Sequence, residues 1–333
     1  MEMFNLSKRS KHSKSIYSYD YKTNKKNQPK LKKSIFVVLF SVFVLSNVFN
    51  NTQIKVNNAS DNTISSTDSS NLVETTVASV TPVAIDSEDD QVKNLIQDKM
   101  EKCNLNTDNF AFFYYNEDEH KYYFYNNDSY FTAASTVKVP IAMYYYDMIK
   151  KNQITLDTAL TYTKDCYEEG GGKTAYTYKY NDNVPISFLL NQSIVNSDNT
   201  AVNILIKNLG DSQYRKDIAT YSSDTLPDEF YNNNITSTKY SYDVLNHLYK
   251  NQDLYSQLIN DMKNSSMGQY LKKYINGYDV AHKYGSYEGY THDYGIVFGK
   301  QTYLIGVFTK NVPDPDELIA DISLDIFNYT FKK

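Results

Sequence analysis

Apolar residues recur at helical spacing directly after the acidic stretch 87–90, at Val92, Leu95, Ile96 and Met100. This spacing predicts an amphipathic helix with acidic residues in its first turn. Two aromatic-rich runs follow at residues 110–115 and 121–125, and the polar segment 116–119 separates them. We interpret these runs as a strand, a turn and a second strand.

A second set of strands is expected near the C-terminus. Residues 279–284, 294–299 and 303–309 have β-strand character, and residues 314–331 carry apolar side chains at helical spacing. Because strands occur at both ends and helices between them, we predict an α+β fold. Its antiparallel sheet would be built from the N- and C-terminal segments and flanked by helices, with an all-helical insert at about residues 131–267.

The first 88 residues have a different character. Residues 1–33 carry ten Lys or Arg against two acidic residues, and an apolar run at residues 34–49 follows them. This predicts a basic cytoplasmic leader and then a cleaved signal sequence or an uncleaved membrane anchor, because the run is shorter than the ~20 residues of a usual spanning helix. Residues 50–88 are rich in Ser, Thr, Asn and Asp, which predicts a disordered linker. Residues 89–333 would form the folded domain outside the cytoplasmic membrane, secreted or tethered.

Composition narrows the possible partners of this domain. The chain has a net charge of −5 although its leader is strongly basic, so the remainder is acidic and offers no basic face for nucleic acid. Cys103 and Cys166 could pair outside the cell, but two cysteines make no disulfide framework, and we favour free thiols. No His or Cys spacing indicates a metal site, and we expect no cofactor and a monomer that contacts the membrane only through its N-terminal segment.

The chemistry of the chain centres on Ser135 and Lys138, which stand three residues apart at the start of an apolar run. Residues at this spacing share one face of a helix, so the amine can reach the hydroxyl and activate it as a nucleophile. Pro140 lacks an N–H and is best tolerated in the first helical turn. We therefore expect Ser135 at or just before the N-terminus of a helix, where backbone N–H groups are free.

Two further motifs follow in the sequence. Ser197-Asp198-Asn199 is predicted to lie on a turn between two apolar helices, and His282-Lys283-Tyr284-Gly285-Ser286 at the end of a predicted strand. Taken one residue at a time, these side chains would more simply be helix caps and solvated lysines. Ser60-Asp61-Asn62 repeats the triplet within the linker, so the triplet alone indicates no function. Ser197 is a candidate because its triplet lies between two predicted helices.

In this order the three motifs resemble the Ser-x-x-Lys, Ser-Asp-Asn and Lys-Thr-Gly set of the class A β-lactamases and penicillin-binding proteins. The resemblance covers about residues 89–331. Residues 131–143, 167–172 (Tyr-Glu-Glu-Gly-Gly-Gly) and 281–283 also look like stretches of Gram-positive serine hydrolases of this type. The resemblance implies a β-lactamase/transpeptidase-like fold.

The resemblance also implies a role for each motif residue. Ser135 would form an acyl-enzyme, with the oxyanion held by the backbone N–H groups of Ser135 and Ser286. Lys138 would accept the serine proton, and Ser197 would relay a proton to the leaving nitrogen. Lys283 would attract the carboxylate that penicillins and D-Ala-D-Ala peptides share.

Asn199, Gly285 and Ser286 would contact the substrate. The sequence departs from the family pattern at two places. Tyr284 replaces the threonine that helps to bind the substrate carboxylate, which bears on substrate choice. The Glu-x-x-Leu-Asn pattern of the Ω-loop, whose glutamate directs water at the acyl-enzyme, is missing, and Glu229 or Asp228 are the nearby candidates for that carboxylate.

Histidines offer a rival base. His120, His247 and His292 lie in no recognisable motif, and His282 should point to the opposite strand face from Lys283. We expect a surface role for each of them.

Three functions stay open. The first is an exported class A-type β-lactamase acting through acyl-Ser135. The second is a penicillin-interacting D-Ala-D-Ala peptidase or esterase with slow deacylation on peptidoglycan stem peptides, and the third is an inactive binding module of the same fold.

Overall fold

The computed structural model describes residues 86–169, 172–210, 212–266 and 268–332. The predicted leader, the apolar run and all but the end of the predicted linker lie outside these ranges. Within the described part of the chain, no helix is both long and apolar enough to cross a membrane. The last two residues of the predicted linker form strand β1 (Ser87–Glu88), which pairs in parallel with β3 (Lys121–Tyr125).

The remaining strands are β2 (Phe110–Asn116), β4 (Phe131–Thr132), β5 (Ala159–Thr161), β6 (Asn183–Pro185), β7 (Ile235–Thr236), β8 (Asp279–Tyr287), β9 (Tyr290–Phe298) and β10 (Tyr303–Lys310). The helices are α1 (Asp90–Cys103), α2 (Lys138–Lys150), α3 (Thr174–Thr177), α4 (Ile186–Val195), α5 (Asn199–Leu209), α6 (Gln213–Ala219), α7 (Asp228–Asn232), α8 (Thr238–Lys250), α9 (Ser256–Lys263) and α10 (Pro315–Phe331). Two 3₁₀ turns are η1 (Ala134–Val137) and η2 (Lys164–Cys166).

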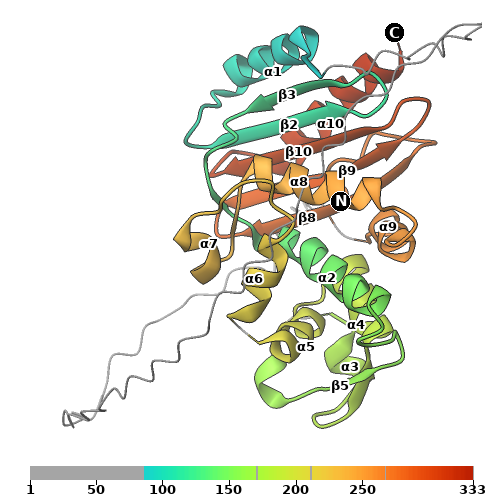
Figure 1. The fold of residues 1–333 in the computed structure, drawn as a ribbon. Helices are drawn as coiled ribbons and strands as arrows, with labels where there is room; N and C mark the ends of the chain where they lie inside the picture. Colours follow the sequence, from blue (N-terminus) through green and yellow to red (C-terminus); the bar gives the residue numbers. More distant parts are fainter. Residues whose placement is uncertain (1–85, 170–171, 211, 267, 333) are drawn as a thin grey trace, which may run out of the picture. The chain divides into compact units, whose positions relative to one another are not determined.

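The main sheet has the order β1-β3-β2-β10-β9-β8, and all pairs except β1 with β3 are antiparallel. The N-terminal and C-terminal strands of the sheet meet where β2 pairs with β10 (Figure 1). The α+β fold predicted from the sequence is therefore confirmed, but the insert between β3 and β8 is not all-helical, as the sequence had predicted. Within that insert, two short strand pairs, β4 with β7 and β5 with β6, are additions to the prediction.

Alternation along β2 explains why its aromatic run is continuous. Phe110, Phe112 and Tyr114 pack into one cluster with α1 and α10, and Ala111 and Phe113 pack on the other face with the helices of the insert. Both faces of the sheet are covered (Figure 1), so every position of β2 is buried.

The N-terminus of α1 forms as the acidic stretch predicts, because the Asp89 carboxylate accepts from the backbone N–H groups of Gln91 and Val92. Both Cys103 and Cys166 are free thiols, as favoured from the sequence.

Candidate active site

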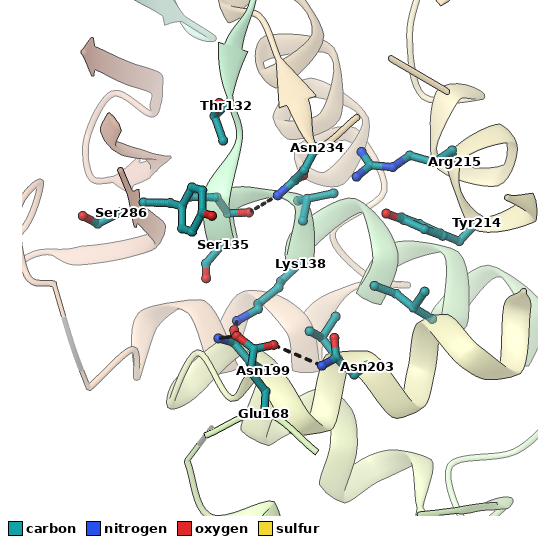
Figure 2. A pocket seen from close by; sticks show the side chains of 15 residues that line it. Thr132, Ser135, Lys138, Glu168, Asn199, Asn203, Tyr214, Arg215, Asn234 and Ser286 are labelled. Atoms are coloured by element: carbon teal, nitrogen blue, oxygen red, sulfur yellow. Dashed lines mark hydrogen bonds between the residues drawn. The ribbon is translucent and has the colours of Figure 1, made fainter. Parts of the chain in front are cut away.

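Ser135 lies in the 3₁₀ turn η1, immediately before α2. Pro140 is the third residue of α2, where its missing N–H leaves no helical bond unmade, so the expected position of Ser135 just before the α-helix is confirmed. Lys138 begins α2 and is only 3% exposed. Figure 2 shows the Ser135 hydroxyl and the Lys138 amine directed into the same cavity, whose volume is about 360 Å³.

Three acceptors hold the Lys138 amine. Its Nζ donates to the backbone oxygen of Ser197 at 2.6 Å, to Ser197 Oγ at 3.3 Å and to Asn199 Oδ1 at 2.6 Å. The Ser-Asp-Asn motif reaches this position because it links α4 to α5, as the sequence predicts. Asp198 caps α5 through the backbone N–H of Ala201, which leaves the side chains on either side of it free to face Lys138.

Lys283 also binds Ser197. Its Nζ donates to Ser197 Oγ at 2.9 Å and to the backbone oxygen of Tyr284 at 2.9 Å, and its side chain is fully buried. One hydroxyl therefore lies between two lysine amines. The structure brings together Ser135, Lys138, Ser197 and Lys283, which are separated by up to 148 positions in the sequence.

Burial makes both lysines weaker bases than usual. Desolvation lowers the pKa of Lys138 to about 8, while the nearby carboxylates of Glu168 and Asp198 oppose this shift. Desolvation also lowers the pKa of Lys283, and the charge of Lys138 lowers it further. Two ammonium groups this close disfavour each other's protonation, so the site is suited to holding one of its amines neutral.

Strand β8 forms the wall of the site beside Ser135. A Cβ atom on Gly285 would lie 2.9 Å from both the backbone oxygen of Ala133 and the backbone nitrogen of Ser135. Only glycine therefore lets the strand approach η1 this closely. Because β8 is an edge strand, backbone groups on its free side face the site, which fits an oxyanion position between Ser135 and Ser286.

Comparisons with known proteins identify the family of this fold. A family model described as the β-lactamase enzyme family matches residues 89–330. The chain belongs to the β-lactamase enzyme family. Its fold is that of the family's serine hydrolases, as the solved structures below show. A search of curated proteins gave no match.

Three solved structures illustrate the likeness. PBP-A has a TM-score of 0.65 and 23% sequence identity, covering 74% of this chain and 98% of that one. The TLA-3 extended-spectrum β-lactamase has a TM-score of 0.62 and 20% identity, covering 72% and 98%. A β-lactamase from Chitinophaga pinensis has a TM-score of 0.61 and 19% identity, covering 72% and 99%. Identities this low show a shared fold.

The carboxylate that lines the cavity is not the one suggested by the sequence. Glu229 is exposed on α7 and is not among the residues that line the cavity, so the structure does not bring it to the other site residues. Glu168 does line the cavity. Its Oε1 accepts from Asn199 Nδ2 at 2.5 Å and its Oε2 from Asn203 Nδ2 at 3.1 Å (Figure 2).

Sequence reasoning did not single out Glu168, although it lines the cavity. It lies in the Tyr-Glu-Glu-Gly-Gly-Gly stretch that carried part of the family resemblance, but upstream of the second motif. Thr200 Oγ1 accepts from its backbone N–H at 3.2 Å, and Asp198 accepts from the N–H of Thr174 at 2.8 Å. These two bonds tie both sides of this loop to the start of α5 and so place the carboxylate.

The second departure, Tyr284, does not fill the cavity. Its ring lies over Gly268, where an added Cβ would come within 2.3 Å of the ring, and forms an edge contact with Tyr270. The ring centroid is 4.2 Å from Lys283 Nζ. Tyr284 is thus packed beside the lysine and is not among the residues lining the cavity.

Two histidines are buried, so the expected surface role is wrong for them. His282 Nδ1 lies 2.8 Å from Asp293 Oδ2, on the strand face opposite Lys283, and both side chains are inaccessible. His292 Nε2 donates to the backbone oxygen of Thr132, and its Nδ1 accepts from the N–H of Thr309. Because helices cover both faces of the sheet (Figure 1), both histidines are buried although they are polar.

Burial lowers the pKa of His292 to about 4, which makes its ring neutral and structural. His120 and His247 are partly or largely exposed and do not line the cavity. Among the described residues, no cluster of three His, Cys, Asp or Glu side chains could hold a metal ion.

Proposed function

We propose that the chain is an exported serine hydrolase that opens β-lactam amides through an acyl-Ser135 intermediate. The observation that supports this most is the pair of hydrogen bonds from Lys138 and Lys283 to Ser197 Oγ, because Lys138 and Ser135 line the same cavity. This arrangement supplies a nucleophile, a base of lowered pKa and a route for a proton to the leaving group.

In the proposed acylation, Ser135 Oγ attacks the lactam carbonyl carbon while its proton passes to Lys138 Nζ. The carbonyl electrons move to the oxygen, which the backbone N–H groups of Ser135 and Ser286 stabilise. When the tetrahedral intermediate collapses, the C–N bond breaks and the nitrogen takes the proton of Ser197 Oγ. Lys138, 3.3 Å away, then returns its extra proton to Ser197. Lys283 remains charged and attracts the substrate carboxylate.

For deacylation we assign the water-activating role to Glu168. It is the one carboxylate among the described residues that line the cavity, and its two hydrogen bonds to asparagine amides fix its position. Glu168 would take a proton from water as the water oxygen attacks the ester carbon. When the tetrahedral intermediate collapses, the bond from that carbon to Ser135 Oγ breaks, and Glu168 would return the proton so that Ser135 leaves as a hydroxyl. If Glu168 does not act, the ester persists and the chain behaves as a penicillin-interacting peptidase, an alternative that the likeness to PBP-A keeps open.

The purified full-length chain should therefore hydrolyse a chromogenic cephalosporin, with an adduct on Ser135 seen by mass spectrometry at short times. Ser135→Ala should abolish both signals, while Ser187→Ala, at an exposed serine that does not line the cavity, should change neither. A lasting wild-type adduct would favour the peptidase. Neither hydrolysis nor adduct with any β-lactam or D-Ala-D-Ala ester would leave the inactive binding module.

Glu168→Gln tests the deacylation step separately. We expect the adduct on Ser135 to persist because the release rate falls roughly 10²- to 10⁴-fold, the usual contribution of a general base. Glu229→Gln is the matched control, since it neutralises the carboxylate suggested by the sequence and should leave release unchanged. The reverse ranking of these two variants would overturn the assignment.

A further inference from the structure

A buried arginine lines the cavity that contains Ser135. Arg215 lies on α6 and is only 6% exposed, yet its Nη1 atom has no hydrogen-bond partner among the described residues. None of the ion pairs formed by the described residues includes it. In Figure 2 its guanidinium end points toward Asn234, which also lines the cavity.

Asn234 connects this position to the nucleophile. Its Nδ2 donates to the backbone oxygen of Ala134 at 3.0 Å, and its backbone oxygen accepts from the N–H of Ala133 at 2.8 Å. These two bonds fix the side chain, so its Oδ1 is left as a buried acceptor without a partner. The wall of the cavity therefore holds one buried donor without a partner, on Arg215, and one buried acceptor without a partner, on Asn234.

An uncompensated charge at such a position is costly, because a buried cation without a counter-ion loses its hydration and gains nothing in return. The other two cations of the site have acidic neighbours: the charges of Glu168 and Asp198 act on Lys138, and that of Asp293 acts on Lys283. Arg215 has only tyrosines, and its guanidinium carbon lies 4.8 Å from the Tyr214 ring centroid. Burial lowers its pKa, as expected for a charge that lacks a counter-ion.

The position of Arg215 indicates which part of a substrate it would meet. In Figure 2, Ser286 lies on one side of Ser135, and Asn234, Arg215 and Tyr214 lie on the other. If the leaving nitrogen and its carboxylate face Ser197 and Lys283, the acyl portion of the substrate extends from Ser135 into the remainder of the cavity. That remainder runs between α5 and α6, where Val202 and Ile206 add apolar surface.

We propose that Arg215 binds a carboxylate carried by the acyl portion of the substrate, with Asn234 Oδ1 accepting from a neighbouring amide N–H. The substrates of this site would then be dianionic, with one carboxylate for Lys283 and a second for Arg215. A charge-assisted hydrogen bond from a buried guanidinium is strong and selective, because a neutral acyl group leaves the cation unpaired. This inference rests on the proposed function, since it concerns the substrate of the same serine.

Two penicillins test the inference directly. Carbenicillin differs from benzylpenicillin by one carboxylate on its acyl group, so the ratio of their acylation rate constants (kcat/KM) isolates that group. In the full-length chain we expect Arg215→Met to lower the carbenicillin-to-benzylpenicillin ratio roughly tenfold or more. Lys216→Met removes an exposed cation from the same helix and should leave the ratio unchanged. Arg215→Lys keeps the charge and should retain part of the preference.

Thermal unfolding supplies a second readout. Removing an unpaired buried charge should leave the Tm unchanged or raise it by a few degrees, and carbenicillin bound to Ser135→Ala should raise the Tm more than benzylpenicillin does. A carbenicillin-to-benzylpenicillin ratio that is unchanged in Arg215→Met would overturn the proposal. If the Tm of Arg215→Met is also lowered, Arg215 is a structural partner of Asn234. Failure of the wild type to be acylated by either penicillin would instead count against the proposed function.

Discussion

The lowered pKa of Lys138 leads to a quantitative prediction for acylation. If its neutral amine accepts the proton of Ser135, the rate depends on the fraction of molecules in which Lys138 is unprotonated. With a pKa of about 8, that fraction is roughly one tenth at pH 7 and one hundredth at pH 6. The acylation rate at saturating substrate should therefore rise about tenfold between pH 6 and pH 7 and level off above about pH 8.

The charge of Glu168 offers a way to move this profile, because that charge raises the pKa of Lys138. Glu168→Gln removes the charge, so the amine should lose its proton at lower pH and the rising part of the profile should shift downward. Glu229→Gln lies outside the cavity and should leave the profile in place. Both variants keep Ser135 and Lys138.

Rapid quenching followed by mass spectrometry measures the Ser135 adduct before any release occurs, so deacylation does not enter the result. Saturating substrate places its carboxylate near Lys283 and favours the charged form of that side chain. A wild-type rate that stays flat from pH 6 to pH 8 would refute the role of Lys138 as the base. A profile that Glu168→Gln leaves unmoved would show that the carboxylate does not act on the amine.

Two further predictions concern how the site is held. Gly285→Ala places a Cβ within 2.9 Å of backbone atoms of Ala133 and Ser135, so β8 and η1 must separate. Acylation should then slow roughly 10²- to 10³-fold, as when an oxyanion donor is lost. The rate of adduct formation measures this effect, and an unchanged rate would contradict the prediction. Asp198→Ala removes the cap of α5 and the acceptor for Thr174, so unfolding should occur roughly 2–8 °C lower by calorimetry, whereas an unchanged Tm would mean that water replaces the carboxylate.

Local sequence patterns predicted what depends on local structure. The helix at α1, the strands β2, β3, β8, β9 and β10, and the turn carrying Ser197 follow from periodicity and capping residues. Pro140 placed Ser135 before α2 because a proline limits where a helix can begin. The order of the three motifs then sufficed to identify the family, since each motif lies at the end of an element that could be recognised separately.

The residues that sequence reasoning missed reach the site through tertiary packing. Glu168 arrives on a loop attached to the start of α5, and Arg215 arrives from a short helix, and neither has a local pattern that marks it. Glu229 was favoured because it occupies the interval where the family's Ω-loop glutamate occurs. His282 and His292 were assigned to the surface because their burial depends on helices that cover both faces of the sheet.

The backbone is strained at both serines of the site: at Ser197 itself, and at the residue directly before Ser135. Ala134, directly before the nucleophile, has a φ of 49°, and Ser197 itself has a φ of 53°. Side chains other than glycine adopt this region at an energetic cost and need surrounding contacts to hold them there. Each residue has such a contact on its backbone oxygen: Asn234 donates to Ala134, and Lys138 donates to Ser197. Lys138 therefore shapes the turn that presents Ser197 as well as serving as the proposed base. Asn234 likewise holds the turn of Ser135 and is the proposed acceptor for the acyl portion of the substrate, so the two strained turns couple the proposed chemistry to the proposed substrate preference.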